Sequence, residues 1–188
     1  MNLTETTGGQ NNKKESTMEE EYSDDIYHKL VLKSTIKVDP VNINDNIKEN
    51  LLTILKNKVE GICIKEGYIK PNSVNIISRT TGKMTLSVFD GNVNYLVSYE
   101  ALLCNPNIGD EIICTVQDVN KSTINGYIED PETSPLNIFL ARQHHIDNPD
   151  YFKLVKNDKI KIKIIGKKYE YLDNNILVFG NLIKKINY

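Results

Sequence analysis

The sequence predicts a mostly β protein of the α+β class, built as a sheet with one helix followed by a small β-barrel. After residue 25, most apolar residues alternate with polar ones, which is the pattern of half-buried strands. One stretch, residues 44–59, has the spacing of an amphipathic helix instead. Five further strand candidates follow Gly109, and that number suits a closed barrel.

Residues 26–38 form the first predicted strand, which Pro40 ends because proline cannot donate to a ladder. The predicted helix of residues 44–59 has Asn44 as its N-cap and Gly61 as its C-terminal stop. Four short β runs separated by turn signals complete the first part: residues 61–70, 73–78, 83–89 and 92–104.

The second part has the element order of an OB fold, with a short helical turn at residues 144–155 after the third strand. Its strand candidates are residues 111–119, 122–130, 135–142, 158–171 and 175–182. Pro106 and Gly109 leave a tight hairpin open as an alternative. A joint between two modules is favoured because a complete set of barrel strands begins after it. We therefore expect domains at residues 26–106 and 107–188.

Composition and charge restrict the classes of function. The chain has 188 residues, 39% hydrophobic and 26% charged, with no stretch near the roughly 18 apolar residues of a membrane helix. We expect no secretory signal and no membrane association. The three cysteines, Cys63, Cys104 and Cys114, lack CxxC spacing and predict an intracellular, reducing location.

Residues 1–25 are predicted to be a disordered acidic tail, because so few apolar side chains cannot offset the entropy of ordering. They carry seven acids and two lysines, whereas residues 151–188 carry nine lysines and three acids. This basic region either attracts polyanions or is a solvated face.

Lysines and isoleucines alternate in residues 158–165, so Lys159, Lys161 and Lys163 share the outer face of the predicted strand. These lysines are candidate RNA-binding residues. The alternative is that they lie on an exposed strand and discourage edge-to-edge pairing.

Tyr127 and Phe139 are expected on the outer face of consecutive strands. Aromatic rings beside a basic groove suit single-stranded nucleic acid, since bases stack on them. The alternative is that the first module or a partner protein covers both rings. Arg142 and His144 follow directly and are candidate contacts to RNA phosphate or base.

Catalysis and metal binding are not expected. His144 and the adjacent His145 diverge on an extended chain, and no zinc-finger spacing is present. A Cys-His nucleophilic pair is disfavoured, because the cysteines lie in apolar runs and are expected to be buried. There is no phosphate-binding glycine loop and no GxSxG motif. We expect a non-enzyme without a cofactor.

The order and spacing of several residues in 59–119 resemble the stalk subunit of DNA-directed RNA polymerase. This family comprises the seventh subunit of eukaryotic RNA polymerase II and its counterpart in archaea, the E-prime subunit. The resemblance covers roughly residues 26–188, and the details are most similar to the versions of large nucleocytoplasmic DNA viruses. The matching residues are Glu60, Gly61, Cys63, Gly67, Tyr68, Ile69, Gly82, Tyr95, Val97, Tyr99, Ala101, Pro106, Gly109 and Glu111.

The resemblance implies an RNP-like tip domain, a sheet plus one helix, followed by an OB barrel of the ribosomal protein S-one type. In that family the tip docks on the core polymerase subunits, the barrel contacts nascent single-stranded RNA, and a helical second stalk subunit is the usual partner. By position, the docking residues are Arg79, Gly82 and Lys83. For a viral version the location is the virus factory in the host cytoplasm, and the virion.

Two departures from the family pattern stand out. The turn at residues 120–123 lacks the glycine and aromatic residue found in many such barrels, and the acidic tail has no counterpart. A free-standing RNA-binding factor in translation or RNA decay therefore stays open as an alternative. So does a structural stalk whose barrel contacts only protein.

Overall fold

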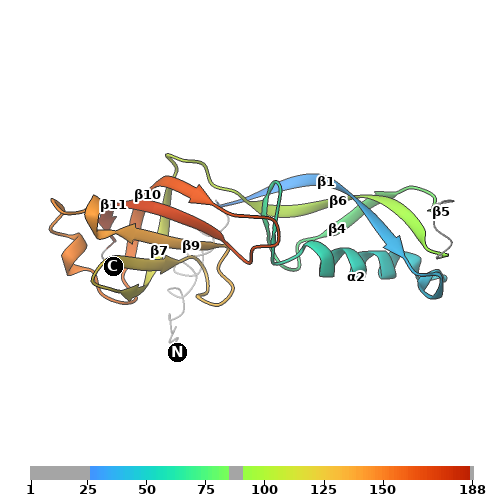
Figure 1. Ribbon diagram of the computed structural model, residues 1–188, viewed down its shortest axis with the longest axis horizontal. Helices are drawn as coiled ribbons and strands as arrows, with labels where there is room; N and C mark the ends of the chain where they lie inside the picture. Colours follow the sequence, from blue (N-terminus) through green and yellow to red (C-terminus); the bar gives the residue numbers. More distant parts are fainter. Residues whose placement is uncertain (1–25, 85–90, 187–188) are drawn as a thin grey trace, which may run out of the picture.

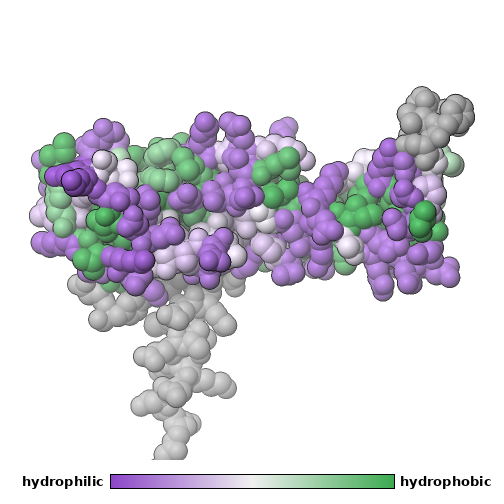
Figure 2. All heavy atoms as spheres, turned by 60° about the horizontal axis from the view of Figure 1, so that its bottom comes forward, coloured by the Kyte–Doolittle hydropathy of each residue, from purple (hydrophilic) through white to green (hydrophobic). Residues whose placement is uncertain are grey.

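The computed structural model describes residues 26–84 and 91–186. The described chain is elongated, with the α2-covered sheet toward one end and the barrel toward the other (Figure 1). Residues 1–25, for which the sequence predicts a disordered tail, and the predicted strand residues 85–89 lie outside the described residues. Figure 2 shows that hydrophilic side chains cover most of the visible face, with apolar ones gathered in separate patches.

The N-terminal sheet has six strands among the described residues. Its order is β1-β6-β3-β2, and β4 and β5 also pair with β6. Strand β1 pairs with β6 along its full length, from Tyr27 opposite Cys104 to Val38 opposite Val93. The strands are β1 (Tyr27–Val38), β2 (Cys63–Ile64), β3 (Gly67–Ile69), β4 (Asn75–Arg79), β5 (Lys83–Met84) and β6 (Val93–Cys104).

Helix α2 (Ile47–Val59) covers one face of this sheet (Figure 1). Leu51 and Leu55 are fully buried against the sheet. The helix begins later than the sequence predicts, because a 3-10 turn, η2 (Pro40–Asn42), precedes it. The expected N-cap Asn44 is wrong: its side-chain oxygen accepts from the Asn46 N–H at 3.0 Å and closes the preceding turn.

The C-terminal strands form the closed barrel that the sequence predicts. Its order is β10-β11-β9-β8-β7, closing back on β10, and all pairs are antiparallel except β9 with β11. This order matches an OB barrel, so the fold is an α+β tip followed by a five-stranded barrel. The strands are β7 (Glu111–Val119), β8 (Thr123–Tyr127), β9 (Leu136–Ala141), β10 (Lys159–Lys168) and β11 (Ile176–Lys185).

Two 3-10 turns, η3 (Arg142–His144) and η4 (Tyr151–Lys153), follow β9. The helical turn predicted for residues 144–155 contains η4 but shares only His144 with η3. The two 3-10 turns help to cover one end of the barrel core, where Tyr151 is buried. The core itself consists of inward side chains from all five strands, including Ile124, Ile138 and Ile162.

The chain passes from the sheet to the barrel between β6 and β7, which belong to different sheets. The sheet therefore does not continue through Pro106. Buried residues at the base of the sheet, including Tyr68 and Cys104, nevertheless join the barrel's apolar cluster. The division at residues 106 and 107 stays a prediction, because the two parts share this core.

Within residues 26–84 and 91–186, no helix is both long and apolar enough to cross a membrane.

Candidate nucleic-acid interface

The alternation on β10 is present as predicted. Ile160 and Ile162 are completely buried in the barrel, while Lys159, Lys161 and Lys163 project from its outer side. Strand β10 pairs with β7 on one side and β11 on the other. It is not an edge strand, so these lysines are not needed to block edge-to-edge pairing.

The outer side of β10 is electropositive. Lys161 pairs with Glu111 of β7 at 2.7 Å, and Lys184 of β11 lies opposite Lys161 in the strand register. The Lys161 hydrogen bond and charge, with smaller contributions from the Lys163 and Lys184 charges, lower the pKa of Glu111. Among the described residues, the Glu111 carboxylate thus lies near ammonium groups from both β10 and β11.

Both predicted aromatic residues lie on the outer face and are half-buried. Tyr127 pairs with Asn137, and Phe139 pairs with Asn125, so the two rings occupy diagonal positions on β8 and β9. Diagonal neighbours of this kind lie about 7 to 8 Å apart, so the two rings belong to one surface.

The structure adds a third ring that the sequence interpretation missed. Phe179 of β11 lies opposite Phe139, with the ring centroids 6.3 Å apart, and 41% of Phe179 is exposed. Gly166 of β10 lies on the other side of Phe179, where no side chain covers the ring. Phe179 therefore lies between the aromatic strands and the lysine-bearing strand. The alternation of the strand could have predicted this, because Val178 and Gly180 point inward on either side of Phe179.

Two asparagines on this surface have an unsatisfied side-chain oxygen. Asn125 lies beside Phe139, and Asn181 follows Phe179 by two residues on the same face of β11. In each, the buried Oδ1 accepts no hydrogen bond from residues 26–84 or 91–186. Buried acceptors without a donor are uncommon in folded proteins, and neither oxygen is open to solvent, so a ligand could reach either one only if its neighbours shifted.

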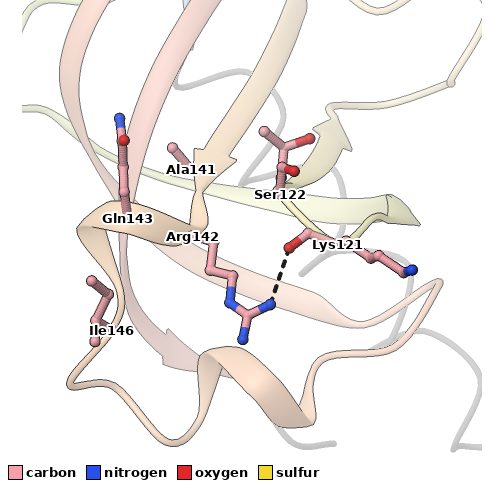
Figure 3. A pocket seen from close by; sticks show the side chains of 7 residues that line it. Lys121, Ser122, Ala141, Arg142, Gln143 and Ile146 are labelled. Carbon is pink, nitrogen blue, oxygen red and sulfur yellow. Dashed lines mark hydrogen bonds between the residues drawn. The ribbon is translucent and has the colours of Figure 1, made fainter.

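Arg142 lies at an open hollow of about 500 Å³ between the β7–β8 turn and the end of β9. Its Nη1 donates to the Lys121 carbonyl at 3.3 Å, as Figure 3 shows, and its guanidinium lies 5.2 Å from the Phe152 ring. The side chains of Gln143 and Ile146 line the same hollow. In OB folds the turn between the first two strands contributes to oligonucleotide binding. The β7–β8 turn is that turn here, so this hollow is a candidate continuation of the surface formed by Tyr127, Phe139 and Phe179.

The two adjacent histidines diverge, as expected. His144 is exposed and lines a second hollow that includes Asn181. His145 is only 3% exposed and has a structural role: its Nδ1 lies 2.8 Å from the Ala141 carbonyl, and its Nε2 accepts from the Leu182 N–H at 2.8 Å. Its ring also stacks on Tyr151. Of these two histidines, only His144 has an exposed side chain.

The cysteines have a packing role. All three are buried and free, and burial raises the pKa of each thiol to about 12. Such thiols are not available as thiolate nucleophiles near neutral pH. In the described part of the chain, no group of three or more histidine, cysteine, aspartate or glutamate residues is arranged to hold a metal ion.

The residues predicted to dock on a larger assembly lie at the far end of the N-terminal sheet. Arg79 ends β4 and lies 5.6 Å from the Tyr95 ring, while Lys83 begins β5 and is exposed. Gly82 packs against Val93 and Tyr95 so closely that a Cβ would collide with both side chains. The three residues therefore lie along one side of β6, on the segment that runs from β4 to β5.

No protein-family model matches the chain. The chain is 27% identical over 161 residues to RNA polymerase II subunit 7 of Arabidopsis thaliana, covering 77% of this chain and 86% of the relative. It is 26% identical over 161 residues to the corresponding soybean (Glycine max) subunit. A protein of Acanthamoeba polyphaga mimivirus, named as a DNA-directed RNA polymerase subunit, is 27% identical over 173 residues, covering 84% of this chain and 82% of the relative.

These matches include a eukaryotic and a viral branch and extend over most of the chain. They confirm the resemblance read from the residues between 59 and 119. Over most of its length, the chain is therefore similar to plant proteins named as the seventh subunit of RNA polymerase II and to a viral protein named as an RNA polymerase subunit.

Proposed function

We propose that this protein is a non-catalytic stalk subunit of a multisubunit DNA-directed RNA polymerase. It docks on the core through the far end of its N-terminal sheet and contacts nascent single-stranded RNA through its barrel. The similarity to polymerase subunits over 77% or more of the chain, across both β-rich parts, supports this proposal. We include in it an intracellular, reducing location and, for a viral version, the virus factory and the virion.

The observation that carries RNA binding is the ring pair of Phe139 and Phe179 beside the lysines of β10. Rings supply stacking for bases of any sequence, and ammonium groups attract the phosphates. Arg142 and His144 extend this surface around the end of β9. The expected binding is weak and tolerant of sequence, because flat stacking surfaces do not discriminate among bases.

Docking is proposed at the segment between β4 and β5 that carries Arg79, Gly82 and Lys83. Apolar side chains lie exposed at the same end of the molecule, including Val41 (84%) and Met84 (64%). Exposed apolar groups beside charged ones are typical of a surface that a partner covers. A helical second stalk subunit is a further proposed partner.

Copurification tests the proposal. We expect the tagged protein, expressed in its source, to recover the large polymerase subunits. Substitution R79Q with K83Q should reduce this recovery, whereas the matched pair K48Q with K65Q, which removes two exposed lysines elsewhere, should not. Recovery of RNA without any polymerase subunit would favour the free-standing RNA-binding factor.

A further inference from the structure

The outer side of the barrel carries a compact group of lysines, here named the lysine face: Lys161, Lys163 and Lys184. Lys161 and Lys184 lie opposite each other on β10 and β11, and Lys163 follows Lys161 on the same side of β10. The carboxylates beside them are Asp110 and Glu111, of which Glu111 pairs with Lys161. Asp158, directly before β10, pairs with Lys185 instead.

The N-terminal segment joins the described chain beside this face. Ile26 lines a hollow of about 340 Å³ together with Glu111 and Lys161. Every residue before Ile26 is therefore tethered at the rim of the lysine face. A short tether of this kind gives an effective local concentration on the order of millimolar.

Residues 19–25 read EEEYSDD, which places five carboxylates in the seven residues before Ile26. An extended chain spans about 3.3 to 3.6 Å per residue, so seven residues reach roughly 24 Å. The lysine face is smaller, because neighbouring strands lie about 4.8 Å apart and alternate residues about 7 Å apart. Both the length and the charge of the segment match the face.

We propose that residues 19–25 bind the lysine face of their own barrel and compete there with the phosphates of RNA. The carboxylates replace phosphate as the counter-charge when no RNA is bound, so the segment weakens RNA affinity. The competitive part of this proposal rests on the RNA binding proposed above; the contact between segment and lysines does not.

Carbodiimide cross-linking of the full chain tests the contact without RNA. The reagent condenses a carboxylate with an amine that touches it into an amide and takes up the water lost. The pair of Lys70 and Glu129, 3.2 Å apart, serves as an internal reference. Cross-links from residues 19–25 to the lysine face support the proposal. Formation of the reference link alone, or of links to distant lysines such as Lys48, overturns it.

RNA competition is tested with the triple variant E19Q, E20Q and E21Q. We expect it to bind a 15-mer of uridine at least about threefold more tightly at about 50 mM salt, with the gap closing as salt screens the charges. The matched control D45N, E49Q and E132Q removes three exposed carboxylates elsewhere and should leave affinity within about twofold.

The difference in RNA affinity between the E19Q, E20Q and E21Q variant and the wild-type tail should vanish when both proteins also carry K161Q, K163Q and K184Q. An equal gain in the tail variant and in its control overturns the competition. If no variant binds RNA while the cross-links form, the RNA function fails and the segment's contact stands.

Discussion

The two β-rich parts of the molecule bury their apolar side chains in different ways. The barrel closes on itself and fills its interior from every strand, so none of its five strands is an edge. The N-terminal sheet buries one face under α2 and exposes Val31, Ile77 and Leu96 elsewhere on its surface. The barrel core therefore needs no covering helix. The sheet, in contrast, buries one cluster under α2 and packs its remaining buried residues, such as Tyr68, against the barrel.

The largest effects should come from truncating one buried side chain in each core, in separate variants. Leu55→Ala removes a fully buried side chain of α2 and should lower the free energy of unfolding by about 2 to 5 kcal/mol. Because its cluster is distinct from the barrel cluster, amide exchange should accelerate around Val97 on β6 and stay slow on β8 and β9. Hydrogen exchange with mass spectrometry measures both.

Ile162→Ala is the counterpart in the barrel, with a similar expected loss of about 2 to 5 kcal/mol. It should accelerate exchange mainly in the barrel. If either substitution accelerates exchange equally in both parts, the sheet and the barrel unfold as one unit and the contrast between them is wrong.

The joint should be the next most sensitive place. Lys167 of β10 donates to the Asn105 side-chain oxygen at 2.6 Å and to the Pro106 carbonyl at 2.7 Å. Lys167→Met removes both charge-assisted bonds and should cost about 1.5 to 3 kcal/mol in urea denaturation. Lys168→Met, at a side chain that is 72% exposed, should cost less than about 0.5 kcal/mol. Equal losses would remove any special role for the joint.

On the barrel surface, substitutions of aromatic residues should change RNA affinity, whereas substitutions of lysines should change its salt dependence. Phe179→Ala should weaken binding of a uridine oligonucleotide by about 1 to 3 kcal/mol, since one stacking surface is lost, with little change in salt dependence. Fluorescence anisotropy measures the affinity, and Ile77→Ala, another exposed apolar residue on the other sheet, is the control. Loss of the folded circular dichroism spectrum would instead mean that Phe179 supports the core.

Replacing Lys159, Lys161 and Lys163 with glutamine should act on the salt dependence instead. Three phosphate contacts on a single strand give a slope of about −2 for log affinity against log salt. We expect the slope to move toward zero in the triple variant. An unchanged slope would show that these lysines are a solvated face.

The smallest expected effect is a pH dependence near Asp158. Burial raises the pKa of this carboxyl, but hydrogen bonds from Lys185 and the Val155 N–H and the charge of Lys185 outweigh it, so the pKa is lowered. A lowered folded-state pKa stabilises the fold above the unfolded value of about 3.9 and loses this contribution as pH falls through the folded value. The wild type should therefore lose more stability than Asp158→Asn below about pH 4, by at most about 1 kcal/mol in denaturant midpoints.

The barrel was predictable because much of each strand alternates, as Ile160, Lys161 and Ile162 do, and alternation is a local property of the chain. Irregular pairings, such as the shift between Ile164 and Gly166, could not be read in this way. The start of α2 was not, since Asn44 serves a turn rather than a cap. Phe179 could have been found by the same alternation in the last strand. Packing across the joint could not, because it depends on contacts such as Tyr169 with Lys65, 104 residues apart.

One contact at this joint has a mechanical consequence. The Cys63 N–H donates to the Asp173 carbonyl at 2.7 Å, and the Leu172 N–H donates to the Cys63 carbonyl at 2.9 Å. Both bonds are made by main-chain atoms, so side-chain substitutions leave the donors and acceptors in place. Leu172 has a φ of +76°, a conformation that costs free energy for a branched residue. The pair of hydrogen bonds holds the backbone in this conformation. These two main-chain bonds therefore restrain how far the barrel can turn relative to the sheet.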